Sequence, residues 1–383
     1  MARARVWYIH LGMKASAAEL FESTYGYAAE WYVFAPGRIN LIGEHTDYSE
    51  GLVFPMAIQH GITIAAAPNR HHELRLISSL AGEAESIDLL QLRTSWIRPK
   101  DWGVYPAAVA RTLKFDIGLD VAIVSDLPMA GGVSSSAALE IGFATLFNSL
   151  GGNLTPLQLA KRVQQAESEL VGVPCGIMDM LASACGVEGS ALLVDTRDLS
   201  IEPVEIPSRY EIYLADTGKS RELAKSDYGN RATQCADAAK ILGSKVLRDV
   251  RSEDLANLND EMLLRRARHV LSENDRVVSF RKALLKGDDS QIGYLLAESH
   301  RSLRDDFEVS CDELDMMVES CLKVPGCIGA RMTGAGFGGA CVAIFRAGGS
   351  QNGPMIEQIY SSGVKTFKPS VRQCLPSGGA RII

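Results

Sequence analysis

The sequence predicts a mixed α/β protein, of the α+β type, with more than one domain. Its 383 residues exceed what one hydrophobic core usually serves, which suggests two or three domains. The opening part is rich in short apolar runs typical of strands, at residues 31–34, 52–54, 62–67 and 74–77. The later part contains two long, charged amphipathic helices, at residues 223–242 and 263–285.

Composition and charge exclude several classes of protein. Hydrophobic residues make up 46% of the chain and charged residues 22%, as in an ordinary globular protein. The net charge of −7 provides no basic surface for a nucleic-acid backbone, and no apolar run is long enough to span a membrane. We therefore expect neither nucleic acid nor a membrane as a partner. The eight cysteines form no Cys-x-x-Cys pair, and none of the seven histidines lies at zinc-ligand spacing to them, which favours reduced thiols in a cytoplasmic protein.

The first twelve residues are expected to be a dispensable extension. A short apolar stretch behind two arginines weakly resembles a signal peptide, but His10 interrupts it. Met13 is a more natural start. The pattern that follows predicts a short amphipathic helix over residues 16–25, in which Ser16 and Glu19 have the spacing of a capping box.

The densest group of charges in an apolar setting lies at residues 35–51. This segment contains one Arg, one His, two Glu and one Asp between apolar residues and glycines. Such charges are costly unless they are paired or face a polar ligand, so the segment predicts a small polar site in a buried frame. A solvated loop between two strands is the alternative. Pro36 and Gly37 are expected to end the preceding strand, so that Arg38 leaves it on a turn.

A second segment has the layout of a phosphate-binding loop. A strand over residues 121–124 leads to a glycine-rich loop and then to a helix over 137–150. The loop contains Gly131, Gly132, Ser134, Ser135 and Ser136. Free backbone N–H groups and the positive end of the helix dipole would face an anion there. A plain N-cap needs only one serine, so we favour a phosphate cradle, although neither a Walker loop nor a dinucleotide fingerprint is present.

Two further segments carry possible functional residues. A helix over residues 157–170 carries Glu167 near its end, and the turn after it places Asp179 between apolar neighbours. Such an Asp is either a helix cap or a catalytic acid–base group. Residues 329–339 are rich in glycine, more than the one or two that a tight hairpin needs. Residues 299–306, dense in Arg and Asp, are expected to form a solvated, ion-paired helix end.

Three of these segments, in this order, resemble the signature motifs of the GHMP small-molecule kinases, and within them of the galactokinase family. Residues 35–48 are similar to the family's sugar-site signature, residues 128–138 to its phosphate-binding motif, and residues 334–339 to its third, glycine-rich motif. Further matches lie at residues 172–179, 265–270 and 299–314. The resemblance extends over nearly the whole chain from about residue 21.

The resemblance implies two α/β domains with the active site in the cleft between them. The first, at residues 1–203, would resemble ribosomal protein S5 domain 2, and the second, at residues 204–383, would be ferredoxin-like; residues 203–208 are the best candidate for the crossing. The implied reaction is transfer of the ATP γ-phosphoryl group to the anomeric hydroxyl of D-galactose, giving galactose 1-phosphate and ADP. The small-molecule partners would be galactose and ATP, bound by a monomer or a weak homo-oligomer.

The resemblance also implies roles for individual residues. The catalytic pair would be Asp179, which takes the sugar proton, and Arg38, whose charge would keep Asp179 ionised and offset charge on the phosphoryl group. The sugar ligands would be Glu44, His45, Asp47, Gly176 and Tyr228. The nucleotide would meet Gly131, Gly132, Ser134, Ser135, Ser136, Trp102 and Tyr105. Ser136 and Glu167 would hold Mg²⁺, a donor set that suits this hard cation.

The chain departs from the family pattern at a few positions. Met180 follows Asp179 where Gln is usual, and a thioether cannot support a carboxylate as an amide does. Ser49, Ala130 and Ala340 replace Asn, Gly and Cys. These changes should affect how precisely the site positions its substrates, and which substrates it accepts, more than the class of reaction.

Two alternatives to a galactose kinase stay open at this point. One is a kinase for the anomeric hydroxyl of another sugar, such as N-acetylgalactosamine or arabinose; the sequence at residues 44–48 favours galactose instead. The other is a non-catalytic regulator that binds sugar and ATP on the same fold. The intact run of serines and alanines at residues 134–138 favours a catalyst.

Overall fold

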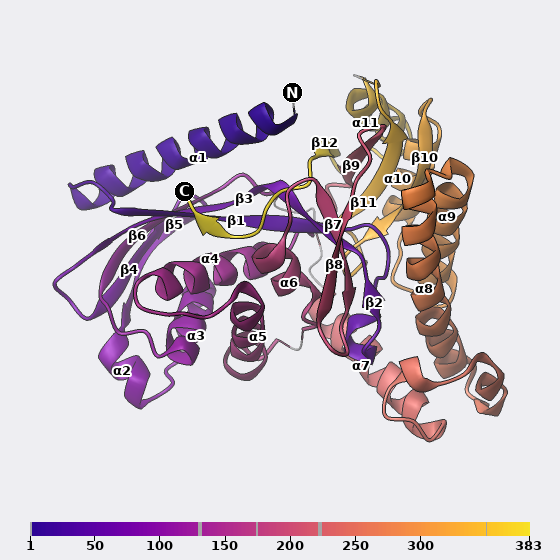
Figure 1. The fold of residues 1–383 in the computed structure, drawn as a ribbon, viewed down its shortest axis with the longest axis horizontal. Helices are drawn as coiled ribbons and strands as arrows, with labels where there is room; N and C mark the ends of the chain where they lie inside the picture. Colours follow the sequence, from indigo (N-terminus) through magenta and orange to yellow (C-terminus); the bar gives the residue numbers. More distant parts are fainter. Residues whose placement is uncertain (1, 129–131, 174, 221–223, 350) are drawn as a thin grey trace.

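The structure is a computed structural model that describes residues 2–128, 132–173, 175–220, 224–349 and 351–383. Two halves lie side by side, each built on an antiparallel or mixed sheet with helices against it (Figure 1). The mixed α/β architecture predicted from the sequence is confirmed. No helix in the described residues is long and apolar enough to cross a membrane.

A six-stranded sheet forms the first half, with the strand order β13-β1-β3-β6-β4-β5. Its strands are β1 (Trp31–Asn40), β3 (Pro55–Pro68), β4 (Glu73–Ser78), β5 (Ala81–Asp88), β6 (Leu119–Ser125) and β13 (Arg381–Ile382). Successive residues of β3 face opposite sides: Ala65 and Ala67 pack with Ala17 and Phe21, whereas Ile64 belongs to the main core. Both faces of this sheet are therefore covered.

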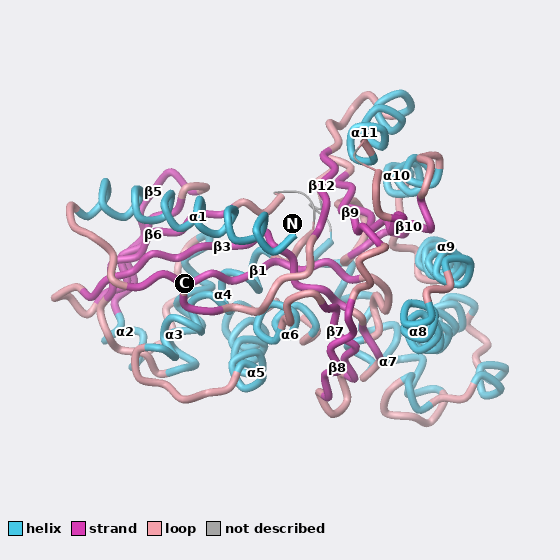
Figure 2. Tube along the Cα trace, turned by 45° about the horizontal axis from the view of Figure 1, so that its top comes forward, coloured by secondary structure: helices cyan, strands magenta, loops and turns pink. Residues whose placement is uncertain are grey.

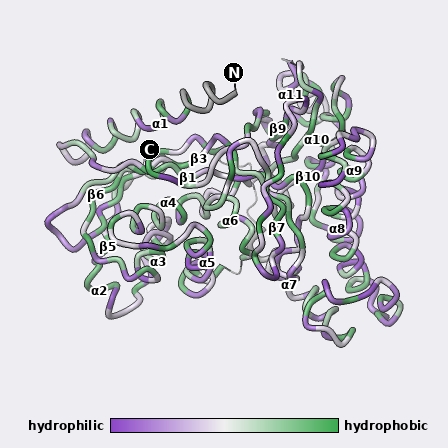
Figure 3. Tube along the Cα trace, viewed as in Figure 1, coloured by the Kyte–Doolittle hydropathy of each residue, from purple (hydrophilic) through white to green (hydrophobic). Residues whose placement is uncertain are grey.

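Helices cover the two faces unequally. Helix α1 (Ala2–Tyr25) lies alone along one face, over β3 and β6 (Figures 1 and 2). On the other face α4 (Ser135–Ser149) and α6 (Met178–Cys185) contact the strands, and α3 (Val104–Leu113) and α5 (Pro156–Ala166) pack against them. The short α2 (Leu89–Thr94) lies at the sheet's end. Apolar residues predominate in β3 and in α4, the two elements that meet in the core of this half (Figure 3).

The second half is a four-stranded antiparallel sheet of order β10-β11-β9-β12. Its strands are β9 (Tyr210–Asp216), β10 (Cys327–Thr333), β11 (Ala340–Arg346) and β12 (Ser370–Cys374). Its helices are α7 (Ala224–Ile241), α8 (Glu261–Lys286), α9 (Asp289–Asp305), α10 (Asp312–Leu322) and α11 (Asn352–Gly363). The strand–helix–strand–strand–helix–strand connectivity and this strand order are those of a ferredoxin-like fold, as predicted.

A small sheet lies where the two halves meet. It contains β2 (Leu52–Val53), β7 (Ser190–Asp195) and β8 (Ser200–Glu205). The proposed division between residues 203 and 204 falls inside β8, and the chain continues directly into β9. The C-terminal strand β13 returns to pair with β1, so the end of the chain joins the first sheet. We keep the division at residue 203 as a proposal.

The predicted turn at Pro36 and Gly37 is wrong, because β1 runs through both residues to Asn40. The strand register shifts between Pro36 and Arg38, which marks a bulge, a place where a proline without an N–H is tolerated. Beyond the bulge the backbone N–H of Arg38 donates to the carbonyl of Val133, 3.1 Å away. The bulge therefore connects β1 to the predicted phosphate loop.

The segment at residues 299–306 is only partly the solvated helix end that was predicted. It closes α9, and its Arg301 and Arg304 do form exposed ion pairs. Ser299 and Ser302, however, are buried, because they lie on the side of the helix that faces α8. The Ser299 hydroxyl donates to the carboxylate of Glu273 at 2.7 Å.

The N-terminal helix begins much earlier than predicted. Residues 2–12 form the first half of α1, and Ser16 is not its cap, since the Ser16 hydroxyl donates to the Gly12 carbonyl within the helix. His10 is buried against the ring of Phe34. Its Nε2 lies 3.1 Å from the carbonyl of Gln59, and Arg381 lies 3.1 Å from its Nδ1. Burial, and then the Arg381 charge, lower the pKa of His10.

Deleting residues 1–12 should therefore lower the free energy of unfolding by about 1–2 kcal/mol, because it removes a buried hydrogen bond and a ring contact. The kinase rate at 25 °C should stay unchanged, since α1 lies on the face of the sheet away from α4 and α6. Denaturant unfolding of the full and shortened chains measures the difference. Equal stability would restore the expectation of a dispensable extension.

Candidate active site

A pocket of about 710 Å³ opens where the two halves of the protein meet. It is lined by residues from β1, the loop before α4, the segment before α6, α7 and the loop after β10. The predicted site residues among its lining are Arg38, Glu44, His45, Asp47, Gly132, Ser134, Ser135, Ser136, Glu167, Gly176, Asp179 and Tyr228. The structure thus brings the sugar segment, the phosphate loop and the distant carboxylate to one place.

Three predicted ligands are not placed in this pocket. Gly131 lies outside the described residues. Trp102 and Tyr105 are absent from the lining and pack as half-buried residues against the core of the first half. Their contact with the nucleotide stays a prediction.

Asp179 and Arg38 form a two-pronged ion pair at the centre of the pocket. Nε of Arg38 donates to Oδ1 of Asp179 at 2.7 Å, and Nη2 donates to Oδ2 at 2.9 Å. Nη1 donates to the carbonyl of Gly132 at 2.6 Å. Burial alone would lower the pKa of Arg38, but the carboxylates of Asp179 and Glu44 raise it. Arg38 is buried while Asp179 stays 31% exposed, so the carboxylate remains accessible to a ligand.

Ser134 joins the phosphate loop to this pair. Its backbone is left-handed, with φ of 59°, and its hydroxyl donates to Oδ2 of Asp179 rather than capping α4. Asp179 lies in the first turn of α6, so it is not the cap residue of that helix. Arg38 and Ser134 thus supply the support that the Met180 thioether cannot.

Glu44 connects the sugar segment to the loop after β10. Its Oε1 accepts from the backbone N–H of Gly334 at 2.6 Å and from the hydroxyl of Thr333 at 3.1 Å. Arg331, fully buried, lies 3.5 Å from the same oxygen. Glu44 itself is buried and lines the pocket. The third, glycine-rich motif therefore fixes a residue of the first motif.

His45 has both ring nitrogens paired within the chain. Nε2 donates to the carbonyl of Ala335 and Nδ1 accepts from the hydroxyl of Tyr48, each at 3.1 Å. Burial first, and then nearby positive charges, lower the pKa of His45 to about 3, so the ring is neutral. Its backbone is left-handed, with φ of 59°. The ring thus offers no free nitrogen to a sugar hydroxyl, and it ties Tyr48 to Ala335.

Asp47 lies against Gly176 and Tyr228. The hydroxyl of Tyr228 donates to Oδ1 of Asp47 at 3.4 Å. A Cβ on residue 176 would come within 1.5 Å of Oδ2 of Asp47, so any larger residue there would displace the Asp47 carboxylate. Burial, followed by the charges of Asp179 and Glu44, raises the pKa of Asp47 to about 6. A carboxylate that is buried beside two other carboxylates is stabilised strongly when the hydroxyl groups of a bound polyol donate hydrogen bonds to it.

Helix α8 holds the backbone of the sugar segment from the second half. Glu273 accepts from the N–H of Gly43 at 2.9 Å, and Asn274 accepts from the N–H of Leu52 at 2.7 Å. His269 donates to the carbonyl of Glu44 at 3.1 Å. Burial alone would raise the pKa of Glu273, but Arg276 and other nearby cations lower it to about 2, so Glu273 is ionised.

Glu273→Ala should lower the free energy of unfolding by about 3–5 kcal/mol, because it leaves Arg276 and the N–H of Gly43 without their buried partner. It should also raise KM for the sugar more than it lowers kcat, since the sugar segment loses its support. Chemical denaturation and steady-state kinetics measure both effects. Glu298→Ala is the control, because this partly exposed partner of Arg301 contributes at most about 1 kcal/mol. Equal effects from the two variants would contradict the expectation.

The phosphate loop ends at α4, and one buried carboxyl stands behind it. Ser135 begins the helix, and Ser136 and Glu167 line the pocket. Glu167 begins a π-helical turn, Glu167–Val171, a feature often found at functional sites. Glu140, one turn after Ser136, is fully buried. Burial, and then the charge of Glu167, raise the pKa of Glu140 well above its ordinary value.

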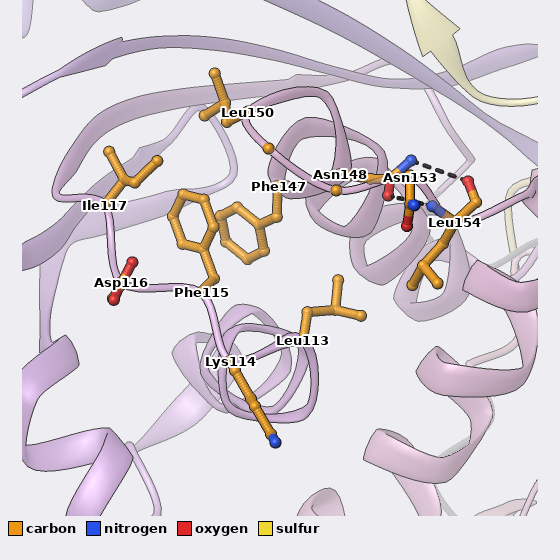
Figure 4. A pocket seen from close by; sticks show the side chains of 12 residues that line it. Leu113, Lys114, Phe115, Asp116, Ile117, Phe147, Asn148, Leu150, Asn153 and Leu154 are labelled. Atoms are coloured by element: carbon orange, nitrogen blue, oxygen red, sulfur yellow. Dashed lines mark hydrogen bonds between the residues drawn. The ribbon is translucent and has the colours of Figure 1, made fainter.

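A second hollow of about 310 Å³ lies at the C-terminal ends of α3 and α4 (Figure 4). Phe115 and Phe147 stack beneath it with ring centres 3.9 Å apart. The amide of Asn148 bonds the backbone of Leu154, and Asp116 pairs with Arg93. Asn148 and Asp116 are thus engaged within the chain, and the predicted site residues gather in the other pocket, between the halves.

Comparison with known proteins decides the family. Residues 19–68 match the galactokinase galactose-binding signature, residues 104–187 the GHMP kinases N terminal domain, and residues 280–354 the GHMP kinases C terminal. The chain is 44% identical to the galactokinase of Chloroflexus aurantiacus over 340 residues, 85% of this chain and 87% of that protein. It belongs to the galactokinase family.

Other galactokinases and a solved structure agree with this assignment. Identity to the Homo sapiens galactokinase is 38% over 92% of this chain and 93% of that protein. The structure of Lactococcus lactis galactokinase complexed with galactose superposes with a TM-score of 0.89 at 32% identity, covering 95% of this chain and 98% of that one. A mevalonate kinase from Methanococcus jannaschii, at 17% identity and a TM-score of 0.64, shares the fold.

Membership of the galactokinase family confirms the predicted fold class and makes the chain an ATP-dependent sugar kinase. Two residues that hold the sugar segment in place, Glu273 and Arg331, were missed in the sequence, and so was the buried Glu140 behind the phosphate loop. Glu273 lies three residues beyond the match at 265–270, and Arg331 lies within the glycine-rich stretch, so proximity to a motif was their only signal. For Glu140 the signal was a lone acid in an otherwise apolar helix face.

Proposed function

We propose that the pocket is a galactokinase active site in which the sugar segment binds galactose and the phosphate loop binds the triphosphate of ATP. The observation that carries this proposal is the Arg38–Asp179 pair. It lies in the pocket that the sugar segment and the phosphate loop both line, and it is bonded to Gly132 and Ser134 of that loop. A hydroxyl bound by the sugar segment and a phosphoryl group bound by the loop would meet near this pair.

In the proposed reaction Asp179 accepts the proton of the anomeric hydroxyl. The hydroxyl oxygen forms a bond to the γ-phosphorus as the bond from that phosphorus to the bridging oxygen of ADP breaks, giving galactose 1-phosphate and ADP. Arg38 orients the Asp179 carboxylate through two hydrogen bonds and offsets negative charge on the transferring group. Positioning and charge stabilisation of this kind supply most of the catalysis in phosphoryl transfer.

The sugar-binding roles divide among four side chains and one backbone. Asp47 and Glu44 accept from sugar hydroxyls, and the backbone of Gly176 together with Tyr228 shapes the same surface. His45 acts indirectly, since both its nitrogens are occupied, and it holds Ala335 beside the sugar. A site that pairs carboxylates with hydroxyls rejects analogues that lack those hydroxyls.

Mg²⁺ fits the residues beside the phosphate loop. Ser136 and Glu167 offer a hydroxyl and a carboxylate, and the fully buried carboxyl oxygens of Glu140 find no hydrogen-bond partner in the described residues. When bound, the cation would neutralise charge on the ATP phosphates. We propose Ser136 and Glu167 as its protein ligands, with Ser135 and Gly132 on the phosphates.

ADP release with a panel of sugars tests the proposal. Turnover of galactose with ATP and Mg²⁺, absent with Mg²⁺ chelated, is the expected result. Turnover confined to N-acetylgalactosamine or arabinose would contradict the galactose assignment, and no turnover on any sugar would contradict the catalytic role. We also propose a cytoplasmic location, which eight free thiols favour, and a monomer or weak homo-oligomer, which size-exclusion chromatography with light scattering tests.

Acid should weaken galactose binding through Asp47. Sugar hydroxyls need the ionised carboxylate, and the raised pKa of about 6 means that a proton occupies Asp47 below that pH in the free enzyme. We therefore expect kcat/KM for galactose to fall toward tenfold per pH unit below about 6, while kcat at saturating sugar falls less. Asp47→Asn should remove this acid limb. A flat kcat/KM between pH 5 and about 7 would contradict the assignment.

A further inference from the structure

Glu140 is an anomaly in the core of the first half. Helix α4 is buried along most of its length, and Glu140 has no exposed surface. Within the residues that the structure describes, neither of its carboxyl oxygens has a hydrogen-bond partner. Buried polar groups are normally paired, and an apolar residue of similar size would pack there at lower cost, so this carboxyl calls for a ligand.

The position of Glu140 indicates which ligand. It follows Ser136 by four residues on α4, so the two side chains share one face of the helix. Its charge interacts with that of Glu167, which lines the pocket together with Ser136. Burial, and then the charges of Glu167 and Glu140, raise the pKa of Tyr105. Two buried carboxylates beside a hydroxyl are a donor set that suits a hard divalent cation. Without a cation between them, the two carboxylates repel each other.

We propose that Glu140 is a positioning residue of the divalent-cation site. Its carboxyl group is a third oxygen donor, which lies behind Ser136 and Glu167 and acts in the outer shell of the cation. This inference rests on the Mg²⁺-dependent reaction proposed above. It adds a residue from the interior of α4 to a site otherwise built from the pocket surface. Outer-shell carboxylates of this kind orient the ligands and raise metal affinity.

The test compares cation affinity with metal-free stability. Mn²⁺ replaces Mg²⁺ as the probe, and its binding to the protein with ADP present is followed by electron paramagnetic resonance. Glu140→Gln removes the charge and keeps the shape, and it should weaken Mn²⁺ binding at least about tenfold. Thermal unfolding in EDTA should not show a lower midpoint, because no hydrogen bond of Glu140 is lost. Glu169→Gln is the matched control, since it removes an exposed carboxylate from the same π-helical turn.

The outcomes separate this inference from the proposed function. Wild-type protein that phosphorylates galactose but binds no Mn²⁺ with ADP overturns both the cation site and the place of Glu140 in it. If wild type and Glu140→Gln bind Mn²⁺ with equal affinity, the role of Glu140 is overturned and the proposed function is not. Glu140→Met, of similar volume, is the second variant: if it and Glu140→Gln both fail to fold, or both unfold at lower temperature in EDTA, the carboxyl is structural and the proposal is overturned.

Discussion

Asp179→Asn should lower kcat for galactose phosphorylation by about 10²–10⁴-fold, the range expected when a general base is removed. The amide keeps the size of the side chain and can still accept from Arg38, but it cannot take the proton of the sugar hydroxyl. KM for ATP should change little, because the described contacts of Asp179 are to Arg38 and Ser134 rather than to the phosphate-facing serines Ser135 and Ser136. Steady-state ADP release with galactose measures both constants.

Asp120→Asn is the matched control for this prediction. Asp120 forms the same two-pronged pair, with Nε and Nη2 of Arg75, but on the large sheet and remote from the pocket. Burial alone would raise the pKa of Asp120, whereas its bonds to Arg75, Tyr27 and Asn69 lower it. Its stabilising effect is thus present above the unfolded-state pKa and lost as pH falls toward the folded-state value. Asp120→Asn should lower stability and leave kcat unchanged. A near-normal kcat for Asp179→Asn would remove that residue from the catalytic role.

Gly176→Ala should lower kcat/KM for galactose by about 10²-fold, because misplacing a binding group by about 1 Å can cost that much. The new Cβ would overlap Oδ2 of Asp47, 1.5 Å away, and the carboxylate must swing out of its place. The backbone of Gly176 has no positive φ, so the effect comes from steric overlap with Asp47 and not from a strained backbone. The loss should appear mainly in KM for the sugar, with KM for ATP unchanged.

Gly229→Ala provides the comparison for this substitution. Gly229 follows Tyr228 in helix α7, and a Cβ there would meet no atom within 4 Å. Alanine is the better helix former, so this variant should match wild type in activity and be slightly more stable, by about 0.5–1 kcal/mol. If Gly176→Ala retained wild-type KM for galactose, the close contact between residue 176 and Asp47 would have no part in sugar binding.

The sequence alone predicted most elements whose pattern is local. Strands at 62–67 and 121–124, the helix after the serine run and the long helix at 263–285 are all present, because periodicity and capping depend on near neighbours. The motifs of the galactokinase family were also readable, since each lies within one continuous stretch. Errors came where tertiary contacts overrode local signals: β1 passes through Pro36 and Gly37 because β3 pairs on both sides of the bulge.

The sequence by itself predicted the residues that we propose to carry the chemistry: a polar sugar segment, a phosphate loop and one distant acid. Only the tertiary structure decided how they are paired. Arg38 and Asp179 are 141 residues apart, and Ser134 turned out to bond Asp179 instead of capping its helix. Both ring nitrogens of His45 proved to be hydrogen-bonded within the chain. Glu273 bonds the N–H of Gly43 in the sugar segment, 230 residues away in the sequence. Local patterns record the chemistry of each segment, whereas pairing depends on contacts that only the packed chain creates.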